Sequence, residues 1–321
     1  MTATFDLQAI NVINCSSMDD FQEQILSIYE RIEEDGFAIV QGWDTSDETF
    51  KQVVQFFGHI QDHPNADDFG LVKLKPVRPK KAEHSYDRSP AHTPGDFLPH
   101  TDGAYLDGFA VINGKVVRVN PPSFLILQCI RPAEQGGISF LVDAQEIFER
   151  LWIEEPEHAK IVIQPRTVSY CAGVDFSAHC PLFEQLSEER WRVRLRSDLM
   201  YIEPWAYSSV KHVVENYLFN PKFRKLHRLT EGQILIADNH RVLHGRDAII
   251  SDNVNHSRLL NKTWLWDAST EHLLSFRDLP PDPNSFKAFE KHHPLNIDVA
   301  NKTLRPIQTG IKTKSKIWSL D

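Results

Sequence analysis

The 321-residue sequence lacks three features that would have indicated a membrane, a secretion route or a nucleic acid. It has no run of about 18 apolar residues, the length that a membrane-spanning helix needs. Its first residues, MTATFDLQAI, lack the basic-then-apolar order of a signal peptide. Its formal charge of −9 gives no general attraction for phosphate backbones. We therefore expect a cytoplasmic protein with neither a membrane nor a nucleic acid as partner.

Cysteine is also scarce. The four residues, Cys15, Cys129, Cys171 and Cys180, form no CxxC pair, which disfavours a zinc ribbon and a dense disulfide framework. We expect buried thiols rather than a reactive nucleophile. The chain also has no internal repeat and no low-complexity tract.

What is present is an ordinary globular composition, with 41% apolar and 25% charged residues. The length permits one large domain or two smaller ones, and we predict one domain over 1–321. Ser17 starts an amphipathic helix that is expected to end near Gly36, and 37–40 is expected to form a buried strand. A second helix is expected from Ser46 to Gly58.

The rest of the sequence indicates a mainly β fold. Short β-prone runs separated by turn signals lie at 122–130, 137–142, 161–170, 191–197, 233–238 and 257–266. Helical patterns interrupt them at 143–152 and 206–219. Many strands with few helices predict a sandwich or barrel with helices packed outside.

Two segments show no regular pattern. Residues 70–99 are basic, rich in proline and non-periodic, which predicts a long surface loop that is a candidate lid. From about residue 277 the sequence reads as a C-terminal extension.

The residues that suggest chemistry begin with His100 and Asp102 in FLPHTDG. Residues two apart in an extended strand point to the same face, so we expect the imidazole and the carboxylate to converge. A lone HxD is common by chance, but His244 follows an apolar strand in QILIADNHRVLHGRD. Two histidines and a carboxylate suit Fe(II) oxygenases. Zinc hydrolases use the same residue types, so the motif alone leaves the metal open.

Arg258 starts the strongly apolar segment RLLNKTWLW. A guanidinium is costly there unless it has an anionic partner. A dicarboxylate co-substrate would supply that partner through a two-pronged contact. A salt bridge at a strand end is the alternative for an isolated arginine.

Together the HTD, LHGR and SRLL segments resemble the TauD/TfdA-type family of Fe(II)/2-oxoglutarate dioxygenases, and the likeness spans roughly 20–267. The resemblance implies a mainly β fold with flanking helices around a double-stranded β-helix (jelly-roll, cupin-like) core. It implies His100, Asp102 and His244 as the catalytic iron ligands. It also implies Arg258 as the clamp on the distal carboxylate of 2-oxoglutarate.

Two further residues are co-substrate candidates by the same resemblance. The GGISF run at 136–140 is similar to the family's GGDT-type turn, which puts Ser139 where a threonine assists the same carboxylate. Arg246 either lies near the keto-acid end of the co-substrate or pairs with an acid such as Asp247. The family's second arginine has no equivalent here.

The resemblance implies 2-oxoglutarate and O2 as co-substrates, and hydroxylation of an unactivated C–H bond in a small, polar or amino-acid-derived metabolite. A desaturating or isonitrile-forming oxygenase of the same family is the alternative. Halogenation is disfavoured, because Asp102 takes the position that halogenases leave open for chloride. A non-catalytic jelly-roll metal-binding protein and a zinc hydrolase are the alternatives of other classes. The sequence leaves a homo-oligomer open.

Overall fold

The computed structural model of the chain describes residues 10–61, 63, 66–67, 69–76, 90–106, 108–112, 115–119, 121–172, 175–250, 258–266, 295–298 and 303–306. The chain divides into two compact units. Unit 1 comprises Met1–His100, Pro122–Ile147 and Asn216–Ala268, and unit 2 comprises Thr101–Pro121, Phe148–Glu215 and Ser269–Asp321.

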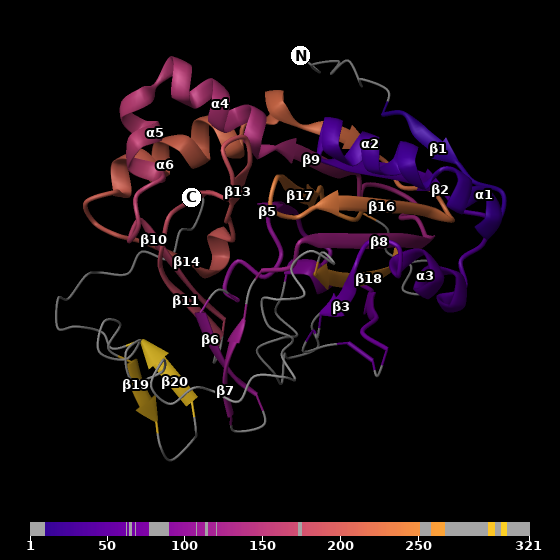
Figure 1. The fold of residues 1–321 in the computed structure, drawn as a ribbon, viewed down its shortest axis with the longest axis horizontal. Helices are drawn as coiled ribbons and strands as arrows, with labels where there is room; N and C mark the ends of the chain where they lie inside the picture. Colours follow the sequence, from indigo (N-terminus) through magenta and orange to yellow (C-terminus); the bar gives the residue numbers. More distant parts are fainter. Residues whose placement is uncertain are drawn as a thin grey trace. The chain divides into compact units, whose positions relative to one another are not determined.

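Unit 1 contains two sheets, as a double-stranded β-helix requires (Figure 1). A seven-stranded sheet has the order β1-β2-β16-β8-β18-β3, with β4 also paired to β18. Its strands are β1 (Val12–Asn14), β2 (Phe37–Gln41), β3 (His59–Gln61), β4 (Val72–Leu74), β8 (Phe124–Arg131), β16 (Gln233–Asp238) and β18 (Leu259–Trp266). A four-stranded sheet has the order β15-β9-β17-β5. Its strands are β5 (Phe97–His100), β9 (Ser139–Asp143), β15 (Lys225–His227) and β17 (Val242–Arg246).

The first helices form largely where the caps predict. The Ser17 side chain accepts a hydrogen bond from the Asp20 backbone N–H, and Gly36 ends the helical segment in the left-handed conformation. The expected single helix is divided at Gln24 into α1 (Met18–Glu23) and α2 (Ile25–Asp35). Strand β2 follows as predicted.

The next helix also begins at its predicted cap. The Ser46 side chain accepts from the Thr49 N–H at the start of α3 (Asp47–Val54). The helix ends at Val54 and does not reach Gly58.

The core of unit 1 follows the two-residue alternation of the seven-stranded sheet. Ile234 and Ile236 of β16 belong to a buried cluster with Phe21 and Phe50 from the helices. Leu235, between them, faces the other side and lines a pocket with residues of the four-stranded sheet. Burial of each such side chain contributes about 1.5–3 kcal/mol relative to exposure. Both faces of this sheet are therefore covered.

Unit 2 contains a five-stranded sheet of order β14-β10-β11-β6-β7 and a separate β12–β13 hairpin. These strands are β6 (Gly108–Ile112), β7 (Lys115–Val119), β10 (Val168–Ala172), β11 (Asp175–Cys180), β12 (Phe183–Gln185), β13 (Trp191–Val193) and β14 (Met200–Ile202). Its helices α5 (Pro156–Val162) and α6 (Tyr207–Val213) lie side by side (Figure 1). Helix α4 (Ala144–Glu154) has residues of both units. Strands β19 (Leu295–Asp298) and β20 (Thr303–Pro306) pair with each other.

Short one-turn helices complete the described elements: η2 (Pro90–His92), η3 (Ser197–Leu199), η4 (Val214–Leu218) and η5 (Pro221–Phe223). Within the described residues, no helix is both long and apolar enough to cross a membrane.

Several sequence predictions need correction. Residues 70–99 were expected to be a loop throughout, but strands β4 and β5 occupy its two ends. Strand β4 is stabilised by pairing with β18, and its Lys73 forms an ion pair with Asp47 at 2.5 Å. Residues 77–89 lie outside the described residues, so the lid stays a prediction.

The strand expected at 161–170 is wrong at its start, because Pro156 begins helix α5. The strand begins only at Val168. The strand expected at 191–197 is limited to β13, and the helix expected at 206–219 gives way to a π turn after Val213.

The β6–β7 hairpin was not predicted. Its signal was present, because an Asn-Gly pair stands between two alternating apolar runs. The C-terminal extension is described only at β19 and β20.

The thiol prediction is confirmed for three of the four cysteines. Cys15, Cys129 and Cys180 are free and buried. Burial raises the pKa of the Cys15 and Cys129 thiols to about 11, which opposes thiolate formation at neutral pH. The side chain of Cys171 lies outside the described residues.

Candidate metal and co-substrate site

His100 and His244 come together through strand pairing. His100 is the last residue of β5, and His244 is its antiparallel partner in β17. Directly opposite residues of an antiparallel pair place their side chains on the same face of the sheet. The two ring centroids lie 4.2 Å apart. The register therefore brings together two histidines that are far apart in the sequence.

Asp102 reaches the same place through a turn, not through the extended strand that its spacing predicted. Strand β5 ends at His100, and residues 102–105 form a turn. Thr101 fixes the start of that turn, because its N–H donates to the Leu195 carbonyl at 2.8 Å and its hydroxyl accepts from the Leu195 N–H at 3.1 Å. One ligand atom from each of His100, Asp102 and His244 lies within 4.8 Å of the others.

The chemistry of this donor set fits a divalent cation. The exposed fractions are 2% for His100, 1% for Asp102 and 9% for His244. A carbonyl oxygen can only accept, so the 2.8 Å contact between His100 Nδ1 and the Leu98 carbonyl puts the proton on Nδ1. The lone pair is then on Nε2, which is the orientation that a metal ligand needs. Two imidazoles and a carboxylate with further positions open suit Fe(II).

Arg196, which the sequence analysis did not select, is an electrostatic neighbour of Asp102. Its guanidinium donates to both carboxylate oxygens of Asp198, at 2.7 and 3.3 Å. Burial lowers the pKa of Arg196, but the carboxylates of Asp198 and Asp102 outweigh burial, so the pKa lies above its ordinary value. The sequence feature that could have pointed to Arg196 is the two-residue spacing of the arginines in WRVRLRS.

Arg258 lies immediately before β18, and its Nη2 donates to the Ser139 hydroxyl at 3.3 Å. Only 8% of Arg258 is exposed. Burial, together with the nearby Arg246 guanidinium, lowers the pKa of Arg258 to about 10. In the described part of the chain, no carboxylate lies at ion-pair distance from it. A buried guanidinium in this state is suited to bind an anion.

A pocket of about 40 Å³ connects this arginine with the metal candidates. Its lining side chains come from both sheets of unit 1. They include Leu127, Leu235 and Leu260 from the seven-stranded sheet, Phe97, Ser139, Phe140, Leu141 and His244 from the four-stranded sheet, and Arg246 and Arg258. One space is thus lined by a candidate metal ligand and by a candidate carboxylate clamp.

Arg246 forms hydrogen bonds to the backbone of the segment that precedes β5. Its guanidinium donates to the backbone carbonyls of Gly95 at 2.5 Å and Pro90 at 3.2 Å, and also to that of Thr93. Its contact with Asp247 is to the backbone carbonyl, at 3.1 Å. The Asp247 carboxylate instead accepts from the Ile138 N–H at 2.5 Å, which positions the neighbouring Ser139. A role for Arg246 toward the co-substrate stays a prediction.

Glycine is required beside His244. A Cβ at Gly245 would overlap the Phe140 ring and the Phe97 carbonyl oxygen. Any larger residue would separate β17 from its neighbours β9 and β5. The HG pair in the sequence therefore reflects close packing of the strands that carry the site.

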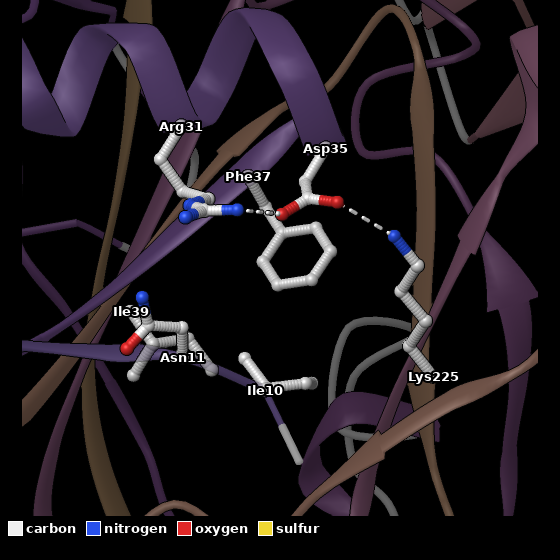
Figure 2. Close-up of a pocket in the computed structure, with 7 residues that line it drawn as sticks. All are labelled: Ile10, Asn11, Arg31, Asp35, Phe37, Ile39 and Lys225. Carbon is white, nitrogen blue, oxygen red and sulfur yellow. Dashed lines mark hydrogen bonds and ion pairs between the residues drawn. The ribbon is translucent and has the colours of Figure 1, made fainter. Parts of the chain in front are cut away.

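A larger hollow, of about 140 Å³, lies elsewhere in unit 1. Figure 2 shows Asp35 between two cations, with distances of 3.1 Å to Arg31 Nη1 and 2.9 Å to Lys225 Nζ. Its remaining lining residues are Ile10, Asn11, Phe37 and Ile39. It contains none of the candidate site residues, and its charges are already paired, so its size does not make it the active site.

Fold and donor set together are those of non-haem Fe(II) oxygenases. The family model described as "Taurine catabolism dioxygenase TauD, TfdA family" matches residues 3–264. The chain belongs to this family of Fe(II)/2-oxoglutarate dioxygenases. Membership of this family makes Fe(II) and 2-oxoglutarate the expected metal and co-substrate of the His100, Asp102 and His244 cluster.

Two proteins with similar sequences are named for different reactions. The chain is 31% identical over 173 residues to a uridine-5'-phosphate dioxygenase from a Streptomyces species, covering 50% of this chain and 58% of the relative. It is 25% identical over 183 residues to a 3-((Z)-2-isocyanoethenyl)-1H-indole synthase from Fischerella ambigua, covering 51% and 62%. The matched region spans less than two thirds of either relative.

A solved structure has a similar fold. The asparagine oxygenase structure with Fe(II), 2S,3S-3-hydroxyasparagine and succinate superposes with a TM-score of 0.58 at 14% identity, covering 77% of this chain and 79% of that chain. At this identity the likeness concerns the fold.

Proposed function

We propose that this dioxygenase hydroxylates an unactivated C–H bond of a small, polar or amino-acid-derived metabolite and releases succinate and CO2. The observation that carries the proposal is the single pocket lined by both His244 and the Arg258–Ser139 pair. A bound metal and the distal carboxylate of a dicarboxylate would then lie at two positions of one cavity. The similar proteins include an asparagine oxygenase and a uridine-5'-phosphate dioxygenase, and both names point to a polar metabolite.

In this proposal His100, Asp102 and His244 hold the iron. Arg258 forms a two-pronged, charge-assisted contact with the distal carboxylate of 2-oxoglutarate, and the Ser139 hydroxyl donates to the same carboxylate. Bound Fe(II) with 2-oxoglutarate and O2 supplies the oxidising chemistry. The chain itself holds and orients these groups, and the apolar residues of the pocket limit access of water.

Arg246 is a third co-substrate candidate, because it lines the pocket beside Arg258. We also propose that residues 1–321 act as one dioxygenase domain in the cytoplasm, with the part of 70–99 between β4 and β5 as a lid. Limited proteolysis with and without 2-oxoglutarate tests this organisation, since independent domains would be released as separate stable fragments.

A desaturating or isonitrile-forming reaction is the second candidate. The observation that favours it is the match to the Fischerella ambigua isocyanoethenyl-indole synthase. Product mass distinguishes the two reactions, because hydroxylation adds one oxygen atom and desaturation removes two hydrogen atoms.

The test is succinate formation by protein reconstituted anaerobically with Fe(II) and 2-oxoglutarate and then exposed to O2. Amino acids, their amide and guanidino derivatives, and nucleoside monophosphates form the substrate panel, and a His244→Ala variant is the matched control. We expect succinate above the control level with one substrate class. Turnover of a substrate without O2 or 2-oxoglutarate would indicate a hydrolase instead, and the absence of succinate with every class would favour the metal-binding protein.

A further inference from the structure

A second cluster of metal-ligating side chains lies in unit 2, in a region to which the dioxygenase reaction assigns no role. Glu155, His158 and His212 each offer one ligand atom within 4.8 Å of the other two. Each side chain is about one third exposed, with exposed fractions of 33%, 32% and 33%. The side chains reach the surface, while the Nε2 atom of His212 is itself buried. We propose that the cluster is a binding site for a divalent cation of intermediate softness, such as Zn²⁺.

The local sequence builds this cluster from two helices. Glu155 directly precedes α5 and His158 lies in its first turn, while His212 lies in α6. Residues three apart are neighbours on a helix surface, so Glu155 and His158 face the same way. The Glu155 side chain makes no capping hydrogen bond to α5. Its carboxylate is directed to the two histidines instead.

The distances suit one shared ion. Glu155 Oε2 lies 2.6 Å from His212 Nε2 and 3.8 Å from His158 Nε2. Two ligand atoms held about 2.0–2.1 Å from a tetrahedral Zn²⁺ are separated by roughly 3.3 Å. The 2.6 Å contact is shorter than that value and the 3.8 Å contact is longer. Ion binding would therefore require the Glu155 carboxylate to move away from His212 and toward His158.

One of the two possible tautomers of His158 is that of a metal ligand. Its Nδ1 lies 3.0 Å from the hydroxyl of Ser209 on α6, and this hydroxyl can accept from Nδ1–H or donate to Nδ1. When the hydroxyl accepts, the Nε2 lone pair points toward Glu155, 3.8 Å away, and can bind a cation placed between the two side chains. Such an outer hydrogen bond is the usual means of fixing a histidine ligand.

The stacking of the two rings supports the same conclusion. The His158 and His212 centroids lie 4.3 Å apart, with 21° between the ring planes. This separation keeps both imidazoles beside the Glu155 carboxylate, where one divalent cation could bind to all three side chains. Two imidazoles and one carboxylate leave a fourth position for water. The bound ion would join α5 to α6.

The experiment measures zinc bound in addition to iron. Wild-type protein loaded with Fe(II) and 2-oxoglutarate is dialysed anaerobically against micromolar Zn²⁺, and both metals are quantified by mass spectrometry. Because zinc also binds two imidazoles and a carboxylate, we expect one equivalent of zinc beyond any zinc that replaces iron at the first site. The His158→Ala/His212→Ala double variant should lose that equivalent and keep its iron, its circular dichroism spectrum and its succinate formation.

Two single substitutions make the test independent of folding and of the iron site. Glu155→Gln keeps the side-chain shape and should weaken zinc binding at least tenfold. Its matched control is Glu157→Gln, because Glu157 is exposed, lies on the same helix and faces Lys160 at 2.7 Å. A His244→Ala protein should still bind one zinc, so failure of the iron proposal would not be mistaken for failure of this one.

Zinc should also raise the melting temperature of the wild type by several degrees, and not that of the double variant. X-ray absorption of the bound zinc should show imidazole scattering at about 2.0 Å. Equal zinc content in the wild type and the double variant would overturn the proposal. The absence of extra zinc in the wild type would overturn it as well, and would leave only the 2.6 Å contact between His212 and Glu155.

Discussion

His244 stands directly opposite His100 in the β17–β5 ladder, and their ring centroids are 4.2 Å apart. Strand register alone therefore places one candidate ligand against another. Gly245, which no larger residue could replace without overlap, keeps β17 close enough for this pairing. The position of the candidate iron site thus depends on the packing of three strands.

Replacement of His244 by alanine should remove the iron and the activity together. Loss of an outer hydrogen bond to a metal ligand already costs 10–100-fold in affinity or activity, so we expect a loss of more than about 100-fold here. Iron content and succinate formation are measured on the same preparation, with the melting temperature as a control for folding. An unchanged iron content with normal turnover would show that His244 is not a ligand.

Asp102 should both balance the charge of the metal and keep halide away from it. Its side chain is 1% exposed, so its removal would open a buried space beside the metal candidates. Asp102→Ala is expected to lose oxygenase activity, and bromide or chloride should then alter the electronic spectrum of the Fe(II) protein. Chlorination as the main reaction of the wild type would contradict this role of the carboxylate.

Arg258 should determine the affinity for 2-oxoglutarate. Truncation of one partner of a buried, charge-assisted pair costs about 2–5 kcal/mol, so Arg258→Ala should raise the 2-oxoglutarate KM at least tenfold. Arg258→Lys should recover part of the loss, because an ammonium keeps the charge and lacks the planar fork. Anaerobic titration of Fe(II)-loaded protein is the measurement.

Two variants serve as controls for Arg258. Ser139→Ala removes one neutral hydroxyl and should have a smaller effect, of about 0.5–1.5 kcal/mol. Arg150→Ala removes an exposed guanidinium 3.9 Å from Glu154 and should leave the affinity unchanged. Wild-type affinity in Arg258→Ala would make Arg246 the next candidate for the clamp.

Glu184 should make the stability of the protein depend on pH. It accepts from Arg192 at 2.5 Å and from the buried Arg194 at 3.1 Å. Burial raises the pKa of Glu184, but the two guanidinium groups outweigh burial and hold it below the ordinary value of 4.5. Its contribution is therefore complete above pH 4.5 and is lost as the pH falls through the lower folded-state pKa.

Glu184→Gln tests this prediction. The carboxylate is about one third exposed, so screening reduces the expected loss to about 1–3 kcal/mol at neutral pH. Urea unfolding at several pH values is the measurement, and the difference between variant and wild type should shrink under acid conditions. A difference that does not change between pH 7 and pH 3 would exclude the ionised pair as its cause.

The sequence by itself determined the features that depend on neighbouring residues. The Ser17 and Ser46 caps and the Gly36 terminator each act over three or four residues, so their positions are readable from the chain. The apolar runs of β8, β16 and β18 are readable for the same reason. The HTD and HGR segments identified the candidate ligands by residue type and by resemblance.

Tertiary structure decided how distant residues meet. The turn that carries Asp102 is fixed by hydrogen bonds to Leu195, and the contact of Arg258 with Ser139 joins two sheets. Strand β4 was read as loop because its pattern is short, and its pairing with β18 is what makes it a strand. The pairing of Glu155 with His212 depends on two helices lying side by side. Such contacts depend on strand register and on packing. The residues next to one another in the sequence do not specify either.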